Sequence, residues 1–393
     1  MTTHVPHSRN SLRSGRWLRR QALVLPLLPA LLLALASCDE PVEPVPPPPH
    51  VQQDTTSHEI EWTVYRFGPG IPSSSLRDII AFSDTNVWAV GGVYPDTPDT
   101  GALGKKPYTV LHWNGREWKK FKVPMQRCTS QNTFFSPFEA IAGNANDLWL
   151  GSSAGEGARW DGVNFYPACI MADSSLSWGA ACKDILHYSE NEVYFAGDLL
   201  GIGEITKYTN GRYSRISTFP YSPVTSLAGD GKGNLWAGGY DYNTGKGSFV
   251  WRTPDGTVRD IRKRERIDKK WEFGGALALW ISHDSLYASV AGYLYIQSLY
   301  DTTHYRYLRI AEADPTRGAK VCIAGLADND VFLAGSFCTV VHYNGKSLRS
   351  YPELTAEFDG GRFYQVSLTR DHVYLCGYDD QTRAIAVIGK RRH

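Results

Sequence analysis

One short phrase recurs along the whole chain: an apolar run with an aromatic residue at its centre and glycines behind it. It reads NVWAVGG at residues 86–92, DLWLGSS at 147–153, EVYFAGD at 192–198 and NLWAGGY at 234–240. Seven copies align on the central aromatic, with spacings of 61, 45, 42, 51, 45 and 42 residues. The aligned aromatics are Trp88, Trp149, Tyr194, Trp236, Tyr287, Phe332 and Tyr374. This period restricts the chain to a repeat architecture.

Each repeat has the same internal order, which predicts four short strands. An apolar strand such as RDIIAFS comes first, a tight polar turn follows, and the aromatic phrase forms the second strand. A third strand ends in an aromatic residue directly before Asn-Gly or Asp-Gly, as at Asn114-Gly115 and Asp161-Gly162. These dipeptides favour tight hairpins, so a fourth strand should close the unit. The pattern predicts an all-β fold, a seven-bladed β-propeller with four-stranded antiparallel blades.

The two ends of the chain complete one another in this scheme. The last repeat stops after AIAVIGKRRH, one strand short, and residues 59–67, EIEWTVYRF, look like a fourth strand such as EWKKFKV. We therefore expect the N-terminal strand to pair as the outer strand of the last blade, because joining the ends removes an open sheet edge. The propeller is predicted to span residues 59–393.

Two stretches carry a family resemblance. DGKGNLWAGG at residues 230–239 resembles the repeats of two-component-regulator-type propellers, and the VGG and HWNGREW segments of the first repeat resemble kelch repeats. The resemblance covers residues 59 to 390 approximately. It implies the propeller fold and leaves the activity open, since this repeat grammar serves many unrelated functions.

Residues 1–37 have the pattern of a signal peptide. Five arginines precede the run ALVLPLLPALLLALA at 22–36, which is short and interrupted by proline. Small residues then precede Cys38 in the sequence LASC. This ending resembles the bacterial lipoprotein box, in which the signal is removed and the cysteine carries diacylglycerol. The resemblance implies lipidation at Cys38. The alternative is an ordinary signal peptide or an N-terminal anchor, with a chance cysteine.

The segment that follows predicts a tether. Residues 38–58 are rich in proline and acid, and we expect them to be extended and disordered. Removing five arginines and no acid with the signal would take the net charge from +1 to −4. We expect a monomer at the bacterial cell envelope, attached through the lipid on Cys38, in the outer membrane rather than the inner. The periplasmic and surface sides both stay open.

The sequence offers little catalytic chemistry. GSSAG at 151–155 matches the G-x-S-x-G pattern, but it ends a strand that leads into another strand, whereas that motif requires a strand-to-helix turn. His112 and His342 share a repeat position with Arg159 and Lys207, which indicates a polar, outward-facing position rather than a metal site. We therefore expect no catalytic residue, no metal and no cofactor. The near-neutral charge gives no indication of nucleic-acid binding.

Six cysteines remain after Cys38, and an exported chain can oxidise them. They form two groups along the sequence. We expect one bridge between Cys169 and Cys182, and one bridge within the second group. The groups are Cys128, Cys169 and Cys182, and then Cys322, Cys338 and Cys376.

The long connections predict the working face. In a propeller, the links between blades and the loops between the second and third strands share one face, which we call the long-loop face. Long segments fall there, at 93–107, 125–137, 169–180, 240–247 and 262–274. Long loops with aromatics are typical of recognition surfaces, although such residues also cap blades. The candidate partner-binding residues are Tyr94, Phe134, Phe135, Trp178, Tyr240, Tyr242 and Trp271.

These observations favour a lipid-anchored, non-catalytic propeller that binds a protein or a glycan at the cell envelope. Two alternatives stay open. One is an envelope carbohydrate-active hydrolase or lyase, which would need converging carboxylates in the channel mouth. The other is a structural or sensory module without a ligand of its own.

Overall fold

The computed structural model describes residues 55–392 except 71–72, 97–105, 129, 131, 171–180, 200, 242–246, 254–257, 261–277, 291, 301–304, 311–312, 315–319 and 359. Residues 52–393 form one compact unit. The signal peptide, Cys38 and most of the tether lie outside the described residues, and so do Trp178, Tyr242 and Trp271. Among the described residues, no helix combines the length and the apolar character needed to cross a membrane.

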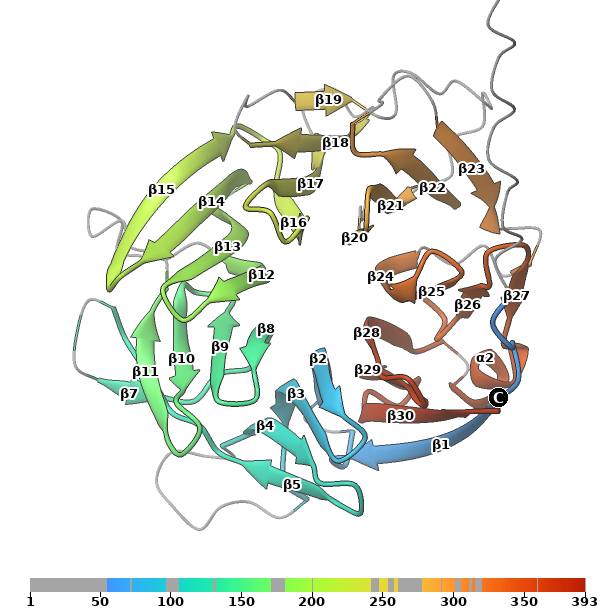
Figure 1. Ribbon diagram of the computed structural model, residues 1–393. Helices are drawn as coiled ribbons and strands as arrows, with labels where there is room; N and C mark the ends of the chain where they lie inside the picture. The colour runs from blue at the N-terminus through green and yellow to red at the C-terminus, as the bar shows by residue number, and fades with distance from the viewer. Residues whose placement is uncertain are drawn as a thin grey trace, which may run out of the picture. The chain divides into compact units, whose positions relative to one another are not determined.

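Seven four-stranded antiparallel sheets stand in a ring, with the first strand of each innermost (Figure 1). This confirms the predicted propeller. The first four blades are β2 (Ser75–Ser83), β3 (Asn86–Val93), β4 (Tyr108–Trp113) and β5 (Trp118–Phe121); β8 (Phe138–Asn144), β9 (Asp147–Ser152), β10 (Glu156–Trp160) and β11 (Phe165–Cys169); β12 (Ala181–Ser189), β13 (Glu192–Leu199), β14 (Ile202–Thr209) and β15 (Arg212–Phe219); and β16 (Val224–Gly229), β17 (Leu235–Asp241), β18 (Gly247–Arg252) and β19 (Val258–Asp260).

The remaining blades complete the ring. They are β20 (Ala278–Ser282), β21 (Ser285–Val290), β22 (Tyr293–Ser298) and β23 (Tyr305–Arg309); β24 (Lys320–Ala327), β25 (Asp330–Gly335), β26 (Val340–Tyr343) and β27 (Leu348–Ser350); and β28 (Arg362–Leu368), β29 (His372–Tyr378), β30 (Ala384–Arg391) and β1 (Ile60–Phe67). Outside the blades lie a hairpin of β6 (Met125–Gln126) with β7 (Thr133–Phe134), and the short helix α2 (Pro352–Phe358).

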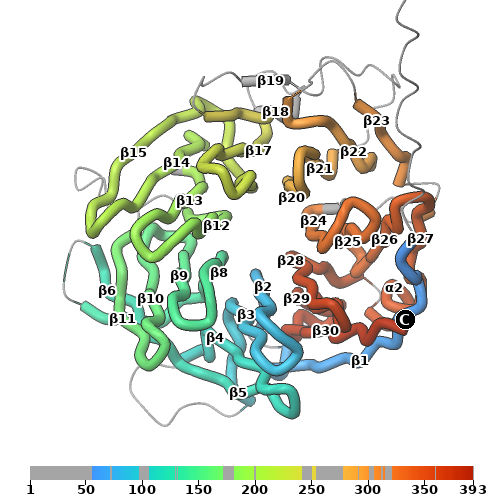
Figure 2. The backbone as a smooth tube through the Cα atoms, in the orientation of Figure 1, coloured from blue at the N-terminus to red at the C-terminus, as the bar shows by residue number. Residues whose placement is uncertain are grey.

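The N-terminal strand closes the ring as predicted. β1 pairs antiparallel with β30 over its full length, from Ile60 opposite Arg391 to Phe67 opposite Ala384. Figure 2 shows the two ends of the described chain side by side at blade 7. Because β1 covers the outer edge of β30, the last blade presents no unpaired C-terminal strand there.

The recurring aromatic lies on the second strand of each blade and packs between blades. All seven aligned aromatics are buried, with exposures between 0 and 6%. The prediction that His112 and His342 face outward is wrong, because both side chains lie against these aromatics. His342 is fully buried and stacks on Phe332 with ring centroids 4.1 Å apart, and His112 stacks on Trp88 at 4.2 Å.

The glycines behind the aromatic have a structural cause. The inner strand of most blades carries a one-residue bulge near its start, and a glycine of the second strand faces it. A Cβ on Gly377 would lie 1.8 Å from the Arg362 carbonyl oxygen, and a Cβ on Gly91 would lie 2.2 Å from that of Ser75. A side chain at either position would collide with the backbone, so glycine makes the bulge possible.

Candidate binding site at the channel mouth

The inner strands surround a central cavity of about 290 Å³. Six of the seven inner strands show a bulge within their first three residues. The chain enters each inner strand from the long-loop face, so these extra residues lie at one mouth of the channel. Bulges commonly redirect side chains at functional sites. The residues at this position are Arg77, Glu139, Lys183, Thr225, Val321 and Tyr364, and all of them line the cavity.

Blades 7 and 1 place a cationic and aromatic cluster at this mouth. The Arg77 guanidinium lies over the Tyr364 ring, 4.4 Å from its centroid, and Arg362 contacts the same ring at 5.1 Å. Tyr378 lies 5.7 Å from Tyr364. Burial raises the pKa of Tyr364, so its hydroxyl stays protonated at neutral pH. Arg77 also faces Glu139, with Nε and Oε1 3.8 Å apart, at the long end of an ion pair.

An exposed phenylalanine stands beside this cluster. Phe337 lies in the connection between β25 and β26, and half of its side chain is exposed. Phe337 and Cys338 both adopt positive φ, at 59° and 49°, although neither is glycine. The connection is held to blade 7 by the Ser336–Arg362 bridge and by the Cys338 amide, which donates to the Gly361 carbonyl. Such conformations persist where surrounding contacts enforce them, often at binding sites.

Two buried carboxyl groups in the channel are bound to the backbone of neighbouring blades. Asp78 accepts hydrogen bonds from the amides of Ile79 (2.7 Å) and Ile141 (2.8 Å). Asp184 does the same with Ile185 (2.8 Å) and Leu227 (2.6 Å). Burial raises the pKa of Asp78 to about 8 and that of Asp184 to about 6. In each group one oxygen accepts from the next residue of its own strand, and the other accepts from the adjacent blade and so joins two blades.

Four of the seven predicted loop aromatics lie in the described part of the chain, and all four are partly buried: Tyr94, Phe134, Phe135 and Tyr240. The Arg127 guanidinium covers Phe134 at 4.3 Å, and Lys106 lies 4.9 Å from the centroid of Phe135. Phe134 also packs against the core between blades 1 and 2. The contacts of Phe134 and Phe135 are thus made within the chain, as blade-capping residues would make them.

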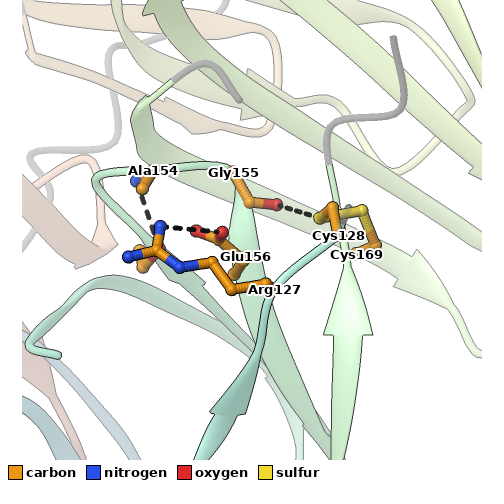
Figure 3. Close-up of a disulfide and its surroundings, with 7 residues drawn as sticks. Arg127, Cys128, Ala154, Gly155, Glu156 and Cys169 are labelled. Atoms are coloured by element: carbon orange, nitrogen blue, oxygen red, sulfur yellow. Dashed lines mark hydrogen bonds and ion pairs between the residues drawn. A yellow bond between two sulfur atoms is a disulfide. The ribbon is translucent and has the colours of Figure 1, made fainter. Parts of the chain in front are cut away.

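The cysteine predictions require correction. Cys169 pairs with Cys128, with Cα atoms 5.4 Å apart, and not with Cys182 (Figure 3). Cys169 ends the outer strand of blade 2, whereas Cys182 lies on the inner strand of blade 3. Cys182 meets blade 2 at β9, two strands inward of β11, and two strand spacings amount to about 10 Å. Cys182 is a buried free thiol packed against Gly151.

The bridge expected within the second group is also absent. Cys322, Cys338 and Cys376 are buried and lie outside any disulfide. Cys322 donates to the Ala334 carbonyl (3.4 Å), Cys338 donates to that of Tyr378 (3.7 Å), and burial raises the pKa of Cys338. They pack as small apolar residues. The bridge that does form holds the β6–β7 connection to blade 2, where Arg127 also pairs with Glu156 at 3.6 Å.

Sequence reasoning missed the channel-mouth residues. Arg77, Glu139, Lys183 and Tyr364 occupy the same position of the repeat in four blades, but the residue type differs from blade to blade. One signal was available in the sequence. This repeat position varies in residue type, whereas the second strand opposite it keeps a glycine. Phe337 had no signal, because a positive φ at phenylalanine cannot be predicted from its neighbours.

Solved structures share this architecture. YCF48 bound to D1 peptide aligns with a TM-score of 0.59 and 13% identity, over 86% of this chain and 100% of that one. The WD40 propeller domain of Doa1 aligns with a TM-score of 0.53 and 13% identity, over 85% and 98%. YCF48 from Cyanidioschyzon merolae gives 0.53 and 14%, over 83% and 98%. At this identity the likeness concerns the fold. No protein-family model and no curated protein matches the chain.

Proposed function

We propose that this chain is a lipid-anchored, non-catalytic propeller that binds a protein at the bacterial cell envelope through the long-loop face. Two observations carry the proposal: the half-exposed side chain of Phe337, and the Arg77–Tyr364–Arg362 cluster to which the Ser336–Arg362 bridge holds the Phe337 connection. Aromatic and arginine side chains are the residues that most often anchor protein interfaces. An exposed phenylalanine held in a strained conformation offers an anchor whose ordering cost is met before binding.

Two further observations support binding rather than catalysis. Asp78 and Asp184 already accept backbone hydrogen bonds on both carboxyl oxygens, so they are poorly placed to act as an acid and base pair. One structural neighbour, YCF48, carries a D1 peptide in its structure. The attachment through Cys38, the envelope location and the tether over residues 38–58 rest on the lipoprotein-like N-terminus.

The binding face can be tested by affinity capture from an envelope extract of the source bacterium. The bait is the full chain, compared with Phe337→Asn, which tolerates a positive φ and removes the aromatic ring. Tyr300→Asn is the matched control, because Tyr300 is 57% exposed at a hairpin turn on the opposite face. A protein retained by the wild type and the control but lost by Phe337→Asn would support the proposal. Equal retention by all three would reject it.

The anchor is tested separately. Cys38→Ala should abolish labelling by a radioactive fatty acid and release the protein from the membrane fraction. Unchanged labelling and retention would remove the lipid from the proposal while leaving the binding face untouched.

A further inference from the structure

The bulge residues of the inner strands give the channel mouth an uneven charge. Blades 7, 1, 2 and 3 contribute Tyr364, Arg77, Glu139 and Lys183, whereas blades 4 and 6 contribute Thr225 and Val321. The polar half of the mouth therefore lies on consecutive blades. Arg77 is 32% exposed and Lys183 is exposed, so both cations reach solvent at the cavity entrance.

The cations at this mouth have few partners. Among the described residues, Lys183 and Arg362 make no ion pair, and the Nε atoms of Arg77 and Arg362 are buried without a hydrogen-bond partner. Of the three carboxyl groups that line the cavity, Asp78 and Asp184 are occupied by backbone amides. This leaves Glu139 to face Arg77, at 3.8 Å, and its side chain is 19% exposed.

The orientation of Arg77 fits a planar anion. Its guanidinium rests on the Tyr364 ring, which fixes the plane, and the edge of a stacked guanidinium stays available for a fork-shaped acceptor. Carboxylates match this geometry with two parallel hydrogen bonds. Partial burial in the cavity entrance strengthens such a pair relative to one in open water.

We infer that the channel mouth binds a carboxylate group, seated on Arg77 with Lys183 adding favourable charge. The carboxylate would pair with the solvent-facing part of the Arg77 guanidinium, because the Nε atom that faces Glu139 is buried. This inference rests on the proposed function, because it names the chemistry that a protein partner brings to the long-loop face. The same chemistry is available from a free small carboxylate or from the acidic side chains of a partner.

The test is calorimetric titration of the full chain with two probes, succinate and the peptide acetyl-(Glu)4-amide. Saturable binding of succinate would indicate a free carboxylate, and binding of the peptide alone would indicate an acidic protein segment. Arg77→Gln should weaken the binding about tenfold or more, as expected for loss of a charged hydrogen bond. Arg77→Lys should give a smaller loss, because it keeps the charge and loses the fork.

Glu139→Gln sharpens the test, since it removes the competing carboxylate and should strengthen binding by about threefold. Arg116→Gln is the control, because Arg116 is exposed at a hairpin turn on the opposite face. Failure of both probes to bind, or binding that is unchanged in Arg77→Gln with a wild-type melting temperature, would overturn the inference. If the chain still captured a protein that Phe337→Asn loses, the proposed function would stand, and only the inference of a carboxylate site would be rejected.

Discussion

Two regions of the molecule differ in how their charged and aromatic side chains are paired. One is the ring-closing seam, where the N-terminal segment meets blades 6 and 7, and the other is the channel mouth. At the seam, the His58 and His342 Nδ1 atoms lie 2.9 Å apart, and His342 Nε2 lies 3.1 Å from Asp330. Asp330 in turn accepts from Arg391 Nη1 at 2.7 Å. At the mouth, Arg77 and Arg362 contact an aromatic ring, and Arg77 has one distant carboxylate.

The proton positions at the seam follow from this chain of contacts. Since Asp330 accepts from His342 Nε2, that nitrogen carries the proton and His342 Nδ1 must accept from His58 Nδ1. The Tyr351 hydroxyl donates to the His58 carbonyl, and Thr56 donates to that of Asn329. These contacts tie the N-terminal segment to blade 6 and so stabilise the ring, although Trp62 Nε1 and Arg391 Nε and Nη2 are buried without a hydrogen-bond partner. The difference at the mouth is exposure, since the Arg77 and Lys183 side chains reach solvent there.

Removing β1 should break the seam and give the largest effect. Deletion of residues 56–68 would expose the β30 edge and the aromatic contacts of Trp62, Tyr65 and Phe67. Burial of large aromatics contributes about 3–5 kcal/mol each, so a loss of about 5 kcal/mol or more is expected. The measurements are thermal unfolding and light scattering. Glu61→Gln is the control, since Glu61 and its ion-pair partner Arg392 are both exposed. Wild-type melting after the deletion would mean that the ring closes without β1.

Asp78→Asn should change how stability depends on pH. Burial raises the pKa of Asp78 to about 8, so the folded state keeps a proton that the unfolded state loses above pH 4. The wild-type free energy of unfolding should therefore fall as pH rises from about 4 to about 8, by at most about 1.4 kcal/mol per pH unit from this group. Asp78→Asn should flatten that slope in urea titrations across this range. If Asp78→Asn kept the wild-type slope, the pH dependence would belong to other groups. Asp284→Asn is the control, because Asp284 is an exposed acid.

His58→Gln should give the smallest effect, of opposite sign. Burial, followed by the charges of His342 and Arg349, lowers the pKa of His58 to about 4. Between pH 6.5 and about 4 the unfolded state binds the extra proton, so the wild type should lose stability as pH falls. The variant should lose less over this window. His283→Gln is the matched control, because His283 is 78% exposed. If the wild type and His58→Gln lost the same stability as the pH falls, His58 would be excluded as the source of that loss.

Much of the fold could be predicted from the sequence because local signals repeat. The buried aromatic of each second strand, the Asn-Gly and Asp-Gly hairpins and the missing final strand each recur or complete a pattern. Together they specify the number of blades, the strand order and the closure by residues 59–67, which the β1–β30 pairing confirms. Hydrophobic periodicity and turn chemistry act over a few residues. When they repeat along a chain, the repeated architecture can therefore be predicted from the sequence.

The site could not be predicted in the same way, since its members meet only across blades. Arg77 and Tyr364 are nearly 300 residues apart in the sequence and come together because blades 1 and 7 are neighbours in a closed ring. The disulfide between Cys128 and Cys169 follows the same logic, because the position of each cysteine within a blade decides which sulfur atoms can approach. The sequence by itself determined which strands form and in what order. Tertiary structure decided which side chains share the channel mouth, because ring closure and bulges set distances that no local pattern encodes.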